Sequence, residues 1–128
     1  MIQPYATLTW MRRRYDYGNG FVTYDSGRPQ WFGRYGLRLR TELTDSMTLR
    51  ADAFARSQTA TKTAYSDGTS DEIGGFTTLN FSLGLDFGKN REFSLDAEVL
   101  NILDKRYQYN YAILEPGVHA NLRLSYNF

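Results

Sequence analysis

The chain has 128 residues, of which 41% are hydrophobic and 16% aromatic, so its length suits one domain. Lys and Arg number 15 against 14 Asp and Glu, and a net charge of +1 argues against a strongly basic nucleic-acid-binding module. The chain has no cysteine and one histidine, His119, which excludes a disulfide framework, a thiolate metal site and a centre with several histidine ligands. No run approaches the roughly 20 apolar residues of a membrane helix, and the first residues lack the pattern of a secretory signal.

Apolar residues recur at every second position in six segments, and this period predicts β-strands. The alternation over residues 78–87 has no exception, because Leu79 and the next four odd positions are all apolar. Phe54 interrupts the pattern in the third segment. In chain order the predicted strands are 5–10, 34–43, 47–56, 78–87, 93–99 and 120–128.

The connections between these strands alternate in length. Thr44–Ser46 and Gly88–Glu92 are short and carry turn-forming residues. The other three connections are long, at roughly 14–30, 57–75 and 101–117. Short turns at one edge and long loops at the other are typical of a transmembrane β-barrel, with the short turns periplasmic and the long loops extracellular. With six strands, both ends of the chain are predicted at the short-turn edge.

Alternation alone fits either a soluble β-sandwich or a membrane barrel, because the apolar face can meet a core or lipid. The polar face carries many charges of both signs, which suits a wet lumen wall with cross-strand pairs. Aromatic residues gather at the strand ends, where they are typical of membrane interfaces. They are Phe87, Phe93, Tyr126 and Phe128 at the short-turn edge, and Trp31, Phe32 and Tyr35 at the other.

The last third of the chain resembles the C-terminal end of a TonB-dependent outer-membrane receptor. The resemblance is carried by the segments Ala97–Tyr107, Glu115–Gly117 and Leu122–Phe128. In that family a penultimate strand runs into an Asn- and Lys-containing motif that ends in Tyr, and a Pro-Gly pair opens the last strand. The motif positions here are Asn101, Asp104, Lys105, Tyr107, Pro116 and Gly117.

The resemblance implies a barrel of roughly 22 strands with an N-terminal plug, which takes up a scarce ligand such as iron-siderophore, haem or cobalamin. Residues 1–128 would be its last six strands in the bacterial outer membrane, inactive in transport alone. The implied partners are membrane lipid, the remaining strands and plug, the barrel assembly machinery and, only through the plug, TonB. The assembly signal would lie on Leu122, Leu124, Tyr126 and Phe128.

Six strands would leave two open edges, and unpaired backbone groups cost several kcal/mol each in lipid. The expectation is therefore a fragment, a split product or a chain that pairs with others. One alternative is a self-contained eight-stranded barrel of structural or adhesive type, with additional strands from 21–24 and 59–65. Another is a soluble, lipocalin-like ligand-binding barrel with an apolar interior.

No nucleophile–base pair and no metal-ligand set is visible, so the sequence predicts no enzyme, no cofactor and no metal. Aromatic loop residues could instead stack on a planar ligand, although they equally suit packing of one loop on another. The basic run Arg12–Arg14 could attract an anion or form a solvated strand end. The candidate ligand contacts are Tyr15, Tyr17, Tyr107, Tyr109, Tyr111 and His119.

Overall fold

The computed structural model describes residues 1–109 and 113–127, and it is built from ten β-strands. Six of these strands form one antiparallel sheet in the order β1-β4-β5-β8-β9-β10. No segment of the described chain forms an apolar helix of membrane-spanning length. The bounds of the six strands are β1 Ile2–Trp10, β4 Trp31–Thr44, β5 Met47–Gln58, β8 Phe76–Phe87, β9 Phe93–Leu100 and β10 His119–Tyr126.

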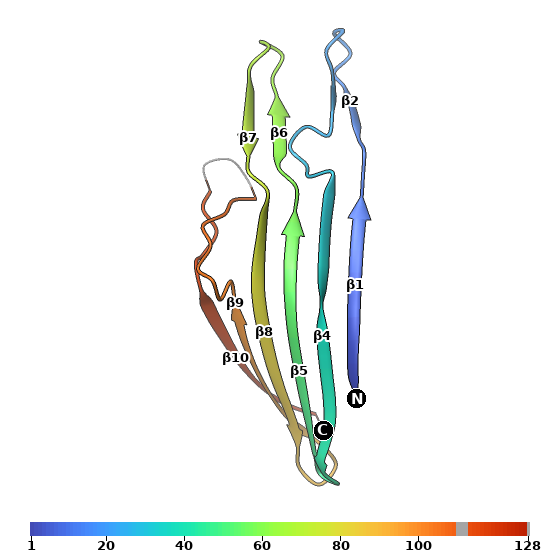
Figure 1. The fold of residues 1–128 in the computed structure, drawn as a ribbon, viewed down its shortest axis with the longest axis vertical. Coiled ribbons are helices and arrows are strands. Elements are labelled where there is room, and N and C mark those ends of the chain that lie inside the picture. Colours follow the sequence, from blue (N-terminus) through green and yellow to red (C-terminus); the bar gives the residue numbers. More distant parts are fainter. Residues whose placement is uncertain (110–112, 128) are drawn as a thin grey trace.

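The predicted six-stranded antiparallel meander is confirmed (Figure 1). Both ends of the chain lie near the short turns, as the even number of strands requires. The first two predicted strands are longer than expected, since they begin at Ile2 and Trp31, and the last ends at Tyr126. β1 and β10 each have one neighbour, so the sheet is open and not closed into a barrel.

Two of the long connections continue as β-hairpins beyond the main sheet (Figure 1). β2 (Arg14–Asp16) pairs with β3 (Val22–Tyr24), and β6 (Thr61–Ala64) pairs with β7 (Ser70–Ile73). The segments considered as extra barrel strands, 21–24 and 59–65, thus contribute to these two-stranded sheets and do not join the main sheet.

The register places most of the apolar strand positions on one face and the polar positions on the other. Leu83, for example, pairs with Ala51 and Ala97, while Ser82 pairs with Asp52 and Glu98. The apolar face is the exposed one, with Leu122 at 75% and Leu124 at 69% exposure. The polar face contains most of the buried residues of the sheet, including Thr48 at 0%, Thr78 at 3% and Asn80 at 5% exposure. This is the reverse of the usual order in a soluble protein.

The polar face is also the concave one. A hollow of about 380 Å³ is lined by Thr7 and Thr9 on β1 and also by Glu98 and Leu100 on β9. Three strands separate β1 from β9 in the sheet, so both can line one hollow only if the sheet curls around its polar side. Right-handed twist is expected to produce such a curl in a long antiparallel sheet.

Phe54, which interrupts the alternation in the sequence, lies buried on the polar face at 6% exposure. Its register partner is Gly36, which has no side chain to compete for the space. The guanidinium of Arg34 lies 3.7 Å from the Phe54 ring centroid and covers it. An aromatic side chain is therefore accommodated on the charged face by a glycine beside it and a cation above it.

Aromatic residues form contacts at both ends of the apolar face. Phe93 stacks with Phe87 at 5.4 Å and contacts Tyr126 at 5.0 Å near the short turns. At the loop end Trp10 and Trp31 lie 6.2 Å apart on β1 and β4. Phe32 lies at this end of β4, as predicted, but it belongs to the other face. Its position in the alternation is that of the polar face, and it lines the hollow described above.

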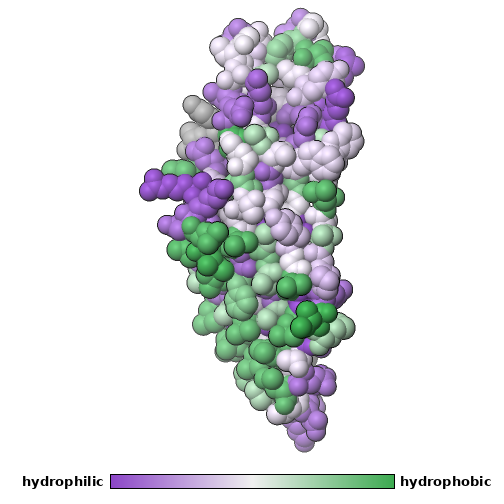
Figure 2. All heavy atoms as spheres, in the orientation of Figure 1, coloured by the Kyte–Doolittle hydropathy of each residue, from purple (hydrophilic) through white to green (hydrophobic). Residues whose placement is uncertain are grey.

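Figure 2 shows how these residues are distributed on one side of the molecule. Hydrophobic residues gather over the lower part of the strands, and mainly hydrophilic residues cover the hairpins above and the tip with the short turns. The exposed apolar surface is therefore a band with a polar margin at each end.

Gly36 provides a test of how the polar face packs. A Cβ there would meet the Ala53 carbonyl oxygen and would lie 2.8 Å from Phe54 Cα. We expect Gly36→Ala to lower the free energy of unfolding by about 1–3 kcal/mol because of overpacking. Denaturant unfolding of the detergent-refolded chain measures this. Gly74→Ala is the control, since nothing lies within 4 Å of a Cβ at Gly74, and equal losses would contradict the account.

Candidate ligand-facing surface

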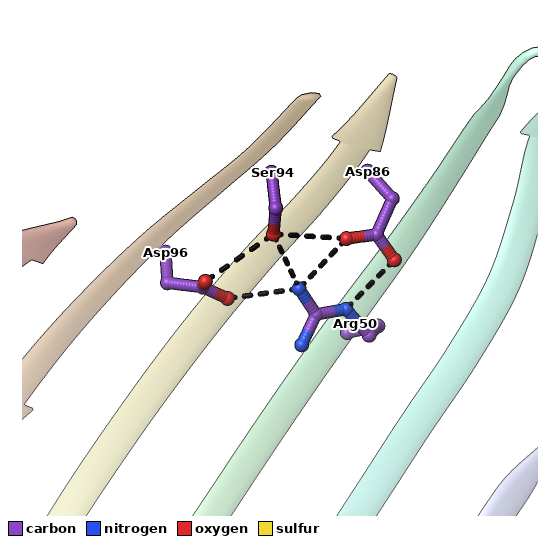
Figure 3. Close-up of polar contacts among 4 residues, drawn as sticks. All are labelled: Arg50, Asp86, Ser94 and Asp96. Atoms are coloured by element: carbon purple, nitrogen blue, oxygen red, sulfur yellow. Dashed lines mark hydrogen bonds and ion pairs between the residues drawn. The ribbon is translucent and has the colours of Figure 1, made fainter. Parts of the chain in front are cut away.

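The centre of the polar face is an ion-pair network around Arg50 (Figure 3). The Arg50 guanidinium donates to both carboxylate oxygens of Asp86, at 2.9 and 2.8 Å, and to Asp96 at 2.9 Å. It also donates to the Ser94 hydroxyl at 3.0 Å. Gly84 leaves room for this arrangement, because a Cβ there would lie 2.9 Å from the guanidinium carbon. The network joins β5, β8 and β9 by their side chains.

A second network lies on the neighbouring strands around Asp52. Arg34 donates to its carboxylate at 3.0 Å, and Arg38 lies 3.7 Å away. The Tyr5 hydroxyl from β1 donates to the same carboxylate at 2.9 Å. The expected cross-strand pairs are therefore present, and they balance much of the charge in the middle of the polar face.

Asn101 forms a turn that ends β9. It is 1% exposed and has a positive φ of 52°, which Asn tolerates better than most residues. Its side chain donates to the Lys105 carbonyl at 2.8 Å and accepts from the Lys105 N–H at 3.0 Å. Its own N–H donates to Asn80 Oδ1 at 3.0 Å. These bonds fix the path of residues 101–105 against β8.

Asp104 connects this turn to the start of β10. Its carboxylate accepts from the Val118 N–H at 3.0 Å, next to Gly117. A Cβ at Gly117 would collide with this carboxylate, so glycine is required for the close approach. The motif residues Asn101, Asp104 and Gly117 thus connect the two ends of the last loop.

The loop between these ends carries an aromatic cluster. Tyr107 lies 4.3 Å from the Phe76 ring and 5.5 Å from that of Tyr109, which itself lies 5.2 Å from Phe76. Burial raises the pKa of the Tyr107 hydroxyl, and nearby Tyr109 and Glu115 raise it further. His119 lies beside the cluster, with Nδ1 3.0 Å from the Gly117 carbonyl oxygen. Tyr107, Tyr109 and His119 line, together with Glu115 and Pro116, a hollow of about 210 Å³.

The remaining candidate ligand contacts lie elsewhere. Tyr15 is on β2, and Tyr17 packs on Phe21 at 5.2 Å within the first hairpin. Tyr111 is outside the described residues. Of the residues assigned to an assembly signal, Leu122, Leu124 and Tyr126 are exposed on the apolar face of β10, while Phe128 is outside the described residues.

Two residues of this surface were not singled out by the sequence. Asn80 is buried and bonds both the Phe54 carbonyl, at 3.3 Å, and the Asn101 N–H. Phe76 is 5% exposed and forms the base of the aromatic cluster. Asn80 occupies a polar position of β8 like its neighbours, and no local pattern distinguishes it. Phe76 comes just before the predicted strand and falls in line with its polar positions. This placement could have indicated that the Phe76 side chain lies on the polar face.

Comparison with known proteins yields no family model, no curated protein and no solved structure that matches this chain. Within residues 1–109 and 113–127, no three His, Cys, Asp or Glu side chains are grouped so that they could hold a metal ion. The features that bear on function are therefore the two faces of the sheet and the loop end of its polar side.

Asn101 allows its side-chain bonds and its backbone conformation to be tested separately. We expect Asn101→Gly to lower the free energy of unfolding by about 1–3 kcal/mol, since it keeps the φ but loses the two bonds to Lys105. Asn101→Ala adds strain at positive φ and should be worse. Urea unfolding gives both values. Asn121→Ala on exposed β10 is the control, and equal effects at the two positions would contradict a specific role for Asn101.

The raised pKa of Tyr107 predicts a pH dependence. Folding favours the neutral phenol, so this contribution to stability is fully present below the ordinary pKa of about 10 and is lost as the pH rises through the folded value. Absorbance titration of phenolate at 295 nm should show one late-ionising tyrosine that disappears in Tyr107→Phe. An unchanged titration curve in that variant would rule out the assignment, and Tyr17→Phe serves as control.

Proposed function

We propose that this chain forms part of the wall of an outer-membrane β-barrel. The observation that carries the proposal is the inversion of the sheet, whose apolar face is largely exposed while its charged, concave face contains most of the buried residues. In a membrane barrel the apolar face contacts lipid and the polar face lines the lumen. On this proposal the short turns are periplasmic, and the long loops with their hairpins are extracellular.

The dimensions of the apolar band support this environment. Leu79 to Phe87 on β8 covers about 26 Å along the strand at about 3.3 Å per residue. A tilt of about 40° would reduce this to roughly 20 Å, and the aromatic contacts at each end extend it towards the band of about 25 Å in known barrels. Above the band the outer face becomes polar, where Ser57 Oγ lies 3.2 Å from the Tyr35 hydroxyl and 2.8 Å from Thr77 Oγ1.

The particular barrel that we propose is that of a TonB-dependent receptor, which takes up a scarce ligand such as iron-siderophore, haem or cobalamin. Support comes from the resemblance of the last third of the chain, and from the way its motif residues Asn101, Asp104 and Gly117 fix the last loop. The edges of β1 and β10 are open, so further strands are needed to complete a wall. On this proposal the chain does not transport alone, and its partners are lipid, the other strands, the plug and the assembly machinery.

The alternatives are less well supported. A lipocalin-like barrel requires its apolar face inside the curl, whereas the charged side chains line the hollows of this sheet. A self-contained eight-stranded barrel requires two more strands in the main sheet, and the two hairpins do not supply them.

Spin labels on adjacent residues test the proposed environment. In the chain refolded into lipid vesicles, a nitroxide at Leu83→Cys should be accessible to dissolved oxygen, because this residue belongs to the exposed apolar face. A label at Ser82→Cys should be accessible to a water-soluble nickel complex instead. Power-saturation electron paramagnetic resonance measures both quantities.

The two positions are matched controls, since they share one strand and differ only in the face. The neighbouring pair Leu95 and Asp96 repeats the test on β9, where the same alternation applies. If the label at Ser82 were accessible to lipid and that at Leu83 were not, the assignment of the two faces would be wrong.

A further inference from the structure

Three arginines from separate segments line one hollow at the loop end of the polar face. The hollow measures about 450 Å³ and is bordered by Arg13 after β1, Arg28 in the first long connection and Arg56 near the end of β5. Phe32 and Tyr109 also line it. Its size is within the range of small-molecule sites, and none of the described residues that border it is acidic.

In the described part of the chain no carboxylate pairs with these three guanidinium groups, in contrast to Arg34 and Arg50 in the middle of the face. Arg56 also borders two other hollows, one lined by Glu98 and one by Glu115. Asp25, the acidic residue close to Arg13, directs its carboxylate to the Arg13 backbone N–H at 2.6 Å and to the Gln30 side-chain amide at 3.0 Å. It therefore holds the backbone of Arg13 and leaves the guanidinium unpaired.

Arg56 also has a like-charge neighbour in the sheet. Arg56 lies directly opposite Arg34 in the register of β4 and β5. Like charges at facing positions of a sheet repel each other. Arg34 is held by Asp52 and by the Phe54 ring, whereas Arg56 has no such partner in the part of the chain that the structure describes. A bound anion would relieve this repulsion.

The rim of the hollow is fixed in position. Asp25 has a positive φ of 54°, and its carbonyl accepts from the Arg28 N–H at 3.1 Å to close a turn. Gly27 N–H donates to the Lys62 carbonyl at 3.1 Å, and Ser26 Oγ accepts from the Ala64 N–H at 3.2 Å. Arg28 is thereby anchored to β6, which reduces the entropy lost when a ligand orders it.

We propose that this hollow binds a small organic anion that carries two or more negative charges on a planar ring. Guanidinium groups pair with carboxylate or phosphate oxygens in bidentate fashion, and the partly exposed side chains of Phe32 and Tyr109 favour an aromatic partner. The inference rests on the proposed function in one respect, since the loop end would be the outer mouth of the lumen. Binding itself depends only on the polar side of the sheet.

Calorimetric titration of the detergent-refolded chain with benzene-1,2,4-tricarboxylate tests the site. The ring-saturated analogue cyclohexane-1,2,4-tricarboxylate has the same charge and should bind several-fold more weakly. Pyrophosphate has comparable charge without a ring and distinguishes a phosphate site from an aromatic carboxylate site. Neutral benzamide should not bind.

Single substitutions test which arginines bind the anion. Arg13→Gln, Arg28→Gln and Arg56→Gln should each weaken binding about tenfold or more. Arg56→Lys keeps the charge but loses the planar fork, so an intermediate loss is expected, and this variant separates a local effect from unfolding. Lys89→Gln removes one positive charge at the opposite end of the sheet and should leave the affinity unchanged.

Each outcome decides a separate point. No binding of the tricarboxylate, equal binding of pyrophosphate, or equal losses in Lys89→Gln and Arg56→Gln would each overturn the inference. Labels at Leu83 and Ser82 report the barrel wall independently of ligand. A correct lipid face without binding would therefore reject the anion site alone, and binding with a reversed face would reject the membrane proposal alone.

Discussion

The register between neighbouring strands is the constraint on which this structure depends. Side chains alternate along a strand with a period of two, so a slip by one residue in any pair would move a whole strand of charges to the apolar face. Backbone bonds do not distinguish one register from the next, and side chains must do so. The bonds of Arg50 to Asp86 and Asp96 connect three strands at one level, and a slip by one residue would place these partners on the opposite face.

The packing of the charged face depends on glycines, which leave space for large side chains, as much as on hydrogen bonds. Gly84 allows the Arg50 guanidinium to lie across β8, and Gly36 allows Phe54 to lie flat beneath Arg34. Exposed ion pairs contribute little each, at about 0–1 kcal/mol, so their main effect is on the choice of partner and register. The paired centre contrasts with Arg13, Arg28 and Arg56 at the loop end, none of which forms an ion pair within the described residues.

Periodicity was sufficient to predict the six strands, their order and the side on which the ends lie, because these depend on local alternation and loop length. Phe54 was recognised as an exception in the alternation, but its contact with the Arg34 guanidinium could not be predicted, since that partner lies on another strand. The hydrogen bond between Asn80 and Asn101 joins positions 21 residues apart, and no local pattern reports such a pairing. The three arginines likewise meet only through the curl of the sheet and the turn at Asp25.

The two outer strands of the sheet differ in how readily they accept another strand. β1 contains Pro4, which lacks an N–H donor, and prolines are one of the devices that limit pairing at a sheet edge. β10 contains no proline and presents Leu122 and Leu124 at the edge. Self-association of the isolated chain would accordingly begin at β10, and the concentration of chain would control how much of it remains monomeric.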